Sequence, residues 1–237
     1  MAEKQKPYLN PVVYGKTSTE EILRFKSLPK EKRVGTYWDN LANAALTSTK
    51  LEIKQHYIRR QSHTCAYCRQ EIVVSHGAAW DTDHIISKDS HPDFMFEPQN
   101  LCVSCKDCNN VKRAKNVLRN QRRVTYPRTA KDYIFCHPHF HDYADHVRVV
   151  RIAGLYLPRT SEGIKTIEIC GLMRFVLLFA NYDCPDIEIA LKIQELSGEL
   201  VSAKHPTEYV AILNMMKTLV DDGLLKAARA ALAARDV

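Results

Sequence analysis

Two Cys-x-x-Cys pairs constrain the fold of this 237-residue chain more than any other feature. They are CAYC at 65–68 and CKDC at 105–108. Two thiolates from one tight turn can share a tetrahedral zinc ion, and two such turns complete a site closed to water. The start of the chain, MAEKQKPYLNP, has no apolar leader, so clustered cysteines indicate metal ligation before disulfides. The sequence therefore predicts a structural zinc held by Cys65, Cys68, Cys105 and Cys108.

A third cysteine makes the second pair ambiguous, because Cys102, Cys105 and Cys108 are evenly spaced and only two are needed. We favour Cys105 and Cys108, since this pair runs directly into NNVKRAKNVL, a segment that can begin a helix. Cys102 then lies in a short strand, NLCVS. The 36 residues between Cys68 and Cys105 are too many for a plain knuckle loop, so we expect further structure between the pairs.

That intervening segment contains WDTDHIISKDS, residues 80–90, which brings together residue types suited to hydrolysis. A neutral imidazole can accept a proton from water at neutral pH, and carboxylates bind hard divalent cations. Neighbouring residues on a regular strand point to opposite faces, so we expect Asp83 and His84 at a strand end. Two interpretations of Asp81 stay open: it holds His84 or a metal-bound water, or it is a solvated strand residue.

The order of elements from Cys65 to Lys112 is C-x-x-C, then D-H-I, then N-L-x-x-x-C-x-x-C-N-x-x-K. This order resembles the HNH endonuclease family, of the kind whose ββα-metal hairpin is held by a four-cysteine zinc. The resemblance implies an α+β fold with a ββα-metal core, flanked by mainly helical regions at 1–62 and 121–237. The core itself is expected at 63–120.

The resemblance also implies roles for single residues. His84 corresponds to the general base, and Asp83 and Asn109 correspond to the ligands of a catalytic Mg²⁺ or Mn²⁺ ion. Asn100 corresponds to the asparagine that ties the hairpin together and helps to orient the histidine. Many relatives have a histidine at the position of Asn109, and members with asparagine there are also active.

Positive charge is concentrated after the second cysteine pair. The chain has a formal net charge of +7, and residues 106–128 hold eight basic side chains against the single acid Asp107. Such a run is commonly a solvated face, but this one directly follows an expected metal ligand, which favours contact with nucleic-acid phosphates. No base-reading motif is present, so we expect sequence-independent binding. The predicted contacts are Lys112, Arg113, Lys115 and Arg119, on a helix whose apolar face includes Val111, Ala114, Val117 and Leu118.

A second cluster, CHPHFHDYADH, contains Cys136, His137, His139, His141 and His146. It is either another metal site or a segment that packs on the core, and we favour packing. Its HP-x-F-x-D-Y portion also resembles a stretch in the HNH subunits of Septu-type anti-phage systems. That resemblance suggests a defence role and an ATPase subunit as partner, and it assigns no residue.

Helices are expected at about 165–181, at 186–201 and from 206 to the end, with a pause at Gly223. The amphipathic segments among them either pack within the chain or dock on a protein partner. No stretch reaches about 20 apolar residues, so we expect no membrane span and a cytoplasmic protein.

Taken together, these features and the resemblance predict a metal-dependent HNH endonuclease that acts on DNA. The resemblance further implies cleavage to 5′-phosphate and 3′-hydroxyl ends. Two alternatives stay open: an RNA-cleaving toxin of the same fold, and a zinc-ribbon binding module without catalysis. The co-occurrence of Asp83, His84, Asn100 and Asn109 argues against the second alternative, because a pure binding module needs none of them.

Overall fold

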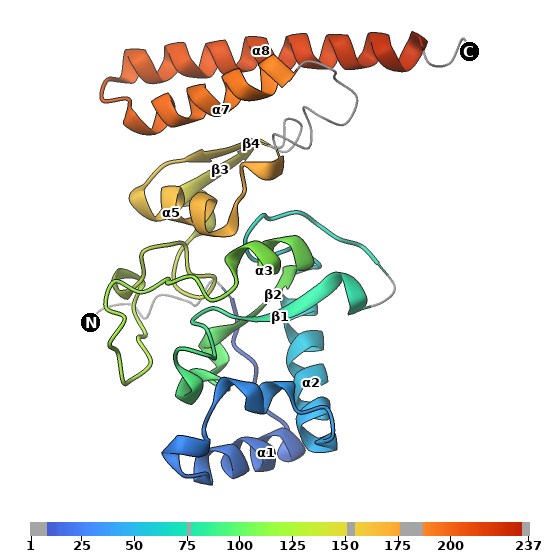
Figure 1. Cartoon of the computed structure of the whole chain (residues 1–237), viewed down its shortest axis with the longest axis vertical. Coiled ribbons are helices and arrows are strands. Elements are labelled where there is room, and N and C mark those ends of the chain that lie inside the picture. Colours follow the sequence, from blue (N-terminus) through green and yellow to red (C-terminus); the bar gives the residue numbers. More distant parts are fainter. Residues whose placement is uncertain (1–8, 75–76, 151–154, 176–186, 234–237) are drawn as a thin grey trace.

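The computed structural model describes residues 9–74, 77–150, 155–175 and 187–233 (Figure 1). The helices are α1 Lys16–Ser27, α2 Ala44–Arg60, α3 Lys106–Lys112, α4 Tyr143–His146, α5 Ser161–Cys170, α7 Ile187–Ser202 and α8 Pro206–Ala233. The strands are β1 Trp80–His84, β2 Leu101–Cys105, β3 Val147–Val150 and β4 Leu155–Pro158. Short 3₁₀ turns lie at Lys30–Lys32, Gly35–Asp39, Gly77–Ala79, Pro92–Phe94, Pro98–Asn100 and Ala130–Asp132. Helices α1 and α2 lie at one end of the molecule, the β1–β2 hairpin and α3 in the middle, and α7–α8 at the other end (Figure 1).

The central element is the antiparallel β1–β2 hairpin followed by α3. Asp83 pairs with Cys102 and His84 with Leu101. His84 is the last residue of β1, which confirms the predicted strand end. The long connection between the strands is closed by Asn100, whose fully buried amide accepts from Ile86 N at 2.8 Å and donates to the Ile86 and Phe94 carbonyls. Asn100 therefore ties the hairpin together, as the sequence predicted.

Helix α3 is shorter than the sequence suggested. It starts directly after Cys105, whose sulfur accepts a hydrogen bond from the Cys108 amide at 3.4 Å. It ends at Lys112, because Arg113 takes a positive φ of 45° that cannot continue a right-handed helix. The prediction that Val117 and Leu118 lie on the same helix is wrong: both are buried beyond its end.

Helix α2 forms a wall beside the hairpin. Asn43 caps it by accepting from the Leu46 amide at 3.0 Å. Its buried residues, Leu46, Thr49, Ile53 and Tyr57, recur at three- or four-residue intervals, so one stripe of the helix faces the core. This stripe packs on β1 and β2. The neighbouring stripe, with Lys50 and Lys54, is left beside β1.

One apolar core joins all three predicted regions, because it runs from Leu9 and Phe25 through Trp80 and Leu101 to Leu172. A second, smaller cluster lies between the β3–β4 hairpin and the α7–α8 pair, and includes Leu155, Leu157, Ile189, Ile193, Leu200 and Met216. The β3–β4 hairpin was not predicted from the sequence.

The C-terminal helices differ in detail from the prediction. Helix α5 begins at Ser161, four residues before the expected 165, and stops at Cys170, where Gly171 takes the left-handed conformation (φ 59°) of a helix C-cap. The rest of the expected 165–181 helix lies partly outside the described residues, from 176 onward. Helix α8 runs through Gly223, so the predicted pause there is wrong. An interior glycine costs a helix about 1 kcal/mol, and packing against α7 outweighs that cost. Within the described ranges, no helix combines the length and apolar character needed to cross a membrane.

Candidate active site

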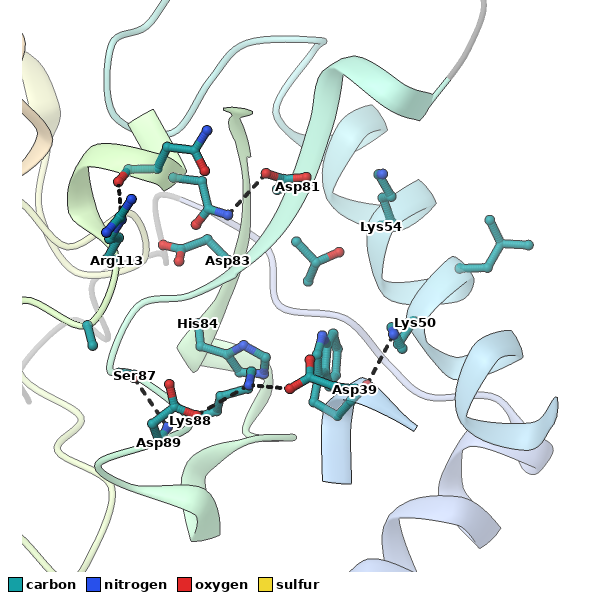
Figure 2. Close-up of a pocket in the computed structure, with 16 residues that line it drawn as sticks. Asp39, Lys50, Lys54, Asp81, Asp83, His84, Ser87, Lys88, Asp89 and Arg113 are labelled. Carbon is teal, nitrogen blue, oxygen red and sulfur yellow. Dashed lines mark hydrogen bonds and ion pairs between the residues drawn. The ribbon is translucent and has the colours of Figure 1, made fainter. Parts of the chain in front are cut away.

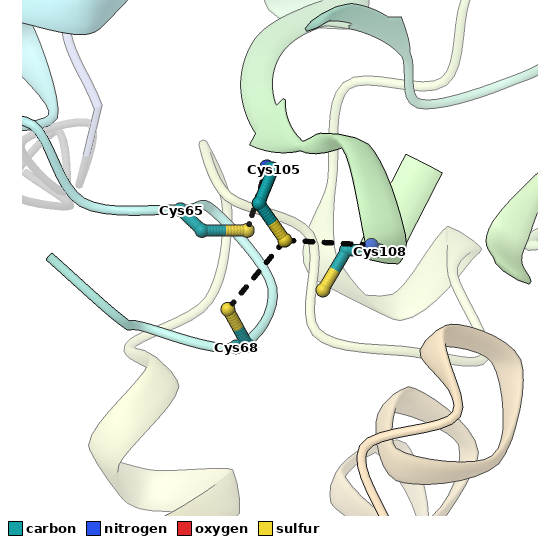
Figure 3. A group of neighbouring side chains, drawn as sticks. All are labelled: Cys65, Cys68, Cys105 and Cys108. Atoms are coloured by element: carbon teal, nitrogen blue, oxygen red, sulfur yellow. Dashed lines mark hydrogen bonds between the residues drawn. The ribbon is translucent and has the colours of Figure 1, made fainter. Parts of the chain in front are cut away.

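The two cysteine pairs meet in one buried cluster (Figure 3). The sulfurs of Cys65, Cys68, Cys105 and Cys108 all lie within 4.8 Å of one another, and Cys68 and Cys105 are 3.9 Å apart. Zinc–sulfur bonds of about 2.3 Å in a tetrahedron place sulfurs roughly 3.8 Å apart, so the donor set fits zinc. The neighbouring thiols lower the pKa of Cys105 and raise the pKa of Cys108, because four thiolates cannot coexist there without a compensating cation.

Cys102 does not belong to this cluster. It is fully buried on β2, and its sulfur lies 3.5 Å from the Tyr67 hydroxyl. The predicted choice of Cys105 and Cys108 is therefore confirmed. Arg174 was not predicted from the sequence to lie here, and it donates to the Cys108 sulfur at 3.1 Å. Its positive charge offsets part of the negative charge of a four-thiolate site.

A cavity of about 700 Å³ opens between α2, β1 and the end of α3 (Figure 2). It is lined by Asp81, Asp83, His84 and Asn109, together with charged residues from α2 and from the loop after β1. The structure thus brings the predicted base and both predicted metal ligands to one cavity. Asn100 lies beneath, inside the hairpin.

His84 is held with one ring nitrogen available. A hydrogen bond to the Met95 backbone engages the imidazole, while Nε2 has no hydrogen-bond partner. The edge of Trp38 packs against the ring, with centroids 4.5 Å apart. Burial, and then the charges of Lys88 and Lys112, lower the pKa of His84 to about 3. The imidazole is therefore neutral, and its Nε2 can accept a proton from water.

Asp83 is anchored from behind. Its carboxylate accepts a hydrogen bond from the Tyr67 hydroxyl and pairs with the Lys112 ammonium, with 3.0 Å between Nζ and Oδ2. Lys112 also donates to the His84 carbonyl at 2.9 Å. Lys112 Nζ also donates to Asp83 Oδ1 at 3.2 Å. A carboxylate offers about four acceptor sites, so the Asp83 carboxylate retains capacity for a cation.

Asn109 and Asp81 are joined by a hydrogen bond of 3.0 Å, in which the amide of Asn109 donates to Asp81 Oδ2. This bond leaves the side-chain oxygen Oδ1 of Asn109 for another partner. Asp81 also pairs with Lys106 at 3.2 Å. Its carboxylate therefore contacts Asn109 and Lys106, partners that neither of its two open interpretations specified. Carboxylate and amide oxygens are the ligands that Mg²⁺ and Mn²⁺ prefer, so this donor set fits a hard divalent cation.

The four predicted phosphate contacts separate in the structure. Arg113 lines the cavity. Lys112 is completely buried, so its ammonium cannot reach a phosphate at the surface, and its predicted role is corrected to the support of Asp83. Lys115 donates to the Ile169 carbonyl at 3.0 Å. Arg119 pairs with Glu162 at 2.5 Å.

Comparison with known families agrees with this geometry. Residues 65–115 match the family model of the HNH endonuclease. This segment is an HNH endonuclease domain. The chain matches no curated protein and no solved structure. The HNH domain therefore indicates a nuclease, and the substrate and the residue roles have to be argued from the site.

Several residues of the HNH cavity come from outside the matched segment and were missed in the sequence. Trp38, Lys50 and Lys54 belong to the N-terminal region and line the cavity. The four-residue spacing of the two lysines on a predicted helix places them on one face. Only tertiary packing reveals that this face borders the HNH domain.

The histidine-rich segment packs against the HNH domain without forming a metal cluster. Both ring nitrogens of His139 contact carbonyl oxygens, those of Leu9 and Leu101, each at 2.9 Å. His137 Nδ1 accepts from the His139 amide, and His141 Nδ1 accepts from the His137 amide. Across the described residues, the four cysteines are the one group of three or more Cys, His, Asp or Glu ligands that converges.

Proposed function

We propose that this protein is a metal-dependent HNH endonuclease that hydrolyses phosphodiester bonds of DNA. The observation that carries the proposal is His84, which lines the cavity together with Asp83 and Asn109 and whose buried Nε2 has no hydrogen-bond partner. A buried nitrogen without a partner costs free energy, and a reacting water bound there offsets that cost.

The chain's own residues divide the chemistry between them. His84 Nε2 accepts the proton of the attacking water, while the bond to Met95 keeps the ring in the tautomer that leaves Nε2 free. Asp83 and Asn109 would hold a Mg²⁺ or Mn²⁺ ion, and Asp81 orients Asn109. Such an ion, when bound, neutralises charge that develops on the phosphate oxygens. Lys112 and Tyr67 keep Asp83 in place.

The zinc has a different role in this proposal. A four-cysteine site has no open coordination position, so zinc bound there stabilises the fold and takes no part in hydrolysis. It fixes the turn at residues 65–68 to the start of α3, and thereby fixes Asn109 relative to Asp83.

DNA is the proposed substrate, bound through its backbone without sequence preference. Arg113 is the predicted phosphate contact that lines the cavity, and the proposal includes it. We further propose a cytoplasmic site of action, in which the buried free cysteines stay reduced, and a role in anti-phage defence with an ATPase subunit as partner.

The test is a cleavage assay on DNA and RNA of the same sequence, single-stranded and duplex, with Mg²⁺, with Mn²⁺ and with EDTA. We expect metal-dependent cleavage of DNA that EDTA abolishes. Cleavage of RNA alone would support the RNA-directed alternative. Binding of either polymer without any cleavage would leave the zinc-ribbon binding module.

A further inference from the structure

Most charged side chains that line the HNH cavity are paired. Lys88 contacts Asp39 at 3.0 Å and Asp89 at 3.3 Å. Asp81 and Asp83 have their own lysine partners outside the cavity wall, Lys106 and Lys112. The charged lining residues that belong to none of these pairs are all cations, namely Lys50, Lys54 and Arg113.

Lys54 is one of these remaining cations. In the part of the chain that the structure describes, no hydrogen bond or ion pair engages its ammonium. The side chain is half-buried on α2, and its aliphatic part passes close to Gly77. A Cβ atom placed on Gly77 would lie 3.7 Å from Lys54 Cε. Burial lowers the pKa of Lys54, an effect that nearby Asp81 opposes. A partly desolvated cation without a counterion is costly, and an anionic ligand would offset that cost.

Lys50, one turn earlier on α2, is a useful contrast. Its ammonium donates to the Trp38 carbonyl at 3.1 Å and lies 5.4 Å from the centre of the Trp38 ring. It holds the residue that packs on His84, so its charge has a partner within the protein. Lys54 has none of these contacts.

Arg113 is the second remaining cation. Its Nε donates to the Asn110 carbonyl at 2.9 Å, and among the described residues no carboxylate pairs with its guanidinium. Its backbone takes φ 45° and ψ −133°, a conformation that glycine adopts far more easily than arginine. Strain of this kind, retained by a charged residue at a cavity wall, indicates a functional constraint.

We propose that Lys54 and Arg113 bind the phosphates on either side of the scissile phosphate. Figure 2 shows the two side chains on opposite sides of Asp81 and Asp83. A nucleic-acid backbone held by both cations crosses β1 from α2 to the end of α3 and passes over Asp81 and Asp83. Helix α2 is then part of the substrate site, although it lies outside the matched residues 65–115. The inference rests on the proposed function, because it takes this cavity as the place of cleavage.

The test is binding of fluorescent DNA of random sequence, single-stranded and duplex, to a His84→Ala background in Mg²⁺ over a range of salt concentrations. Lys54→Gln and Arg113→Gln are compared with Lys26→Gln and Arg148→Gln, which remove the same charge from exposed positions on α1 and β3. The slope of log K against log salt is negative, and loss of one phosphate contact reduces its magnitude by about 0.9 for duplex and about 0.7 for single-stranded DNA. We expect that decrease for each test variant, about twice as much for the double variant, and recovery in Lys54→Arg.

Slopes in the test variants equal to those of the two controls would overturn the inference, as would an absence of salt-dependent binding in the His84→Ala protein. Zinc content and circular dichroism report whether each variant is folded. If Lys54→Gln does not fold, the salt dependence of Lys54→Arg, which keeps the charge, still tests the contact. Failure of the proposed function looks different: the wild-type chain would not cleave DNA, whatever the slopes are.

Discussion

Replacing Lys112 by methionine tests the internal support of the site. The Lys112–Asp83 pair is buried, with the lysine side chain fully enclosed and the aspartate side chain 6% exposed. Lys112→Met keeps the length of the aliphatic stem and removes both the pair and the hydrogen bond to the His84 carbonyl. Breaking a buried pair by removing one partner costs about 3–5 kcal/mol, because the remaining charge is left uncompensated. We therefore expect Lys112→Met to lower the free energy of unfolding by about that amount.

Urea denaturation in buffer free of Mg²⁺ and Mn²⁺, with the structural zinc retained, measures this loss, and Lys115→Met is the control. Lys115 is exposed and its ammonium donates to the Ile169 carbonyl, so loss of this side-chain contact should cost no more than about 1 kcal/mol. Added Mg²⁺ should recover part of the loss in Lys112→Met, since a cation bound at Asp83 replaces the missing charge. Equal free energies of unfolding for the two variants would refute the contribution of the buried Lys112–Asp83 pair to stability. A loss that Mg²⁺ leaves unchanged would argue against a cation at Asp83.

Three further predictions follow from the site. Cys105→Ser and Cys108→Ser should lose the zinc and become insoluble, whereas Cys102→Ser should retain about one zinc per chain by elemental analysis. Loss of zinc in Cys102→Ser alone would contradict the ligand set. Asp83→Ala and Asn109→Ala should need more Mg²⁺ or Mn²⁺ for half-maximal cleavage, and an unchanged metal titration would remove them as ligands. Removal of residues from 203 onward takes away α8, so it should leave zinc content unchanged but abolish capture of the proposed ATPase partner; loss of zinc would show that α8 is needed by the core.

Local patterns in the sequence predicted the centre of this molecule. The spacing of Cys65, Cys68, Cys105 and Cys108 implies a shared metal whatever path the intervening chain takes. His84 lies at the end of a short strand, as the sequence predicted. The end of α3 could not be predicted in this way, because Arg113 is a good helix former in sequence and takes a positive φ only in its tertiary setting.

The roles of the basic residues could not be predicted from sequence periodicity, because they depend on tertiary packing. In the sequence, Lys112 looks like a solvent-exposed charge. In the structure it lies one helical turn after Cys108 on the buried face of α3, where it pairs with Asp83. Lys54 lies on a helix more than ten residues before the first cysteine, and no local signal connects it with β1. The β3–β4 hairpin was missed because its strands are four residues each and lack clear alternation.

The rate of DNA cleavage by His84→Ala relative to wild type tests the central claim most directly. His205→Ala is the matched control, since His205 is exposed at the start of α8. A general base contributes about 10²–10⁴-fold, so we expect His84→Ala to lose activity by that factor with zinc content unchanged, and His205→Ala to retain it. A His84→Ala protein that keeps its zinc and cleaves DNA at the wild-type rate would contradict the account.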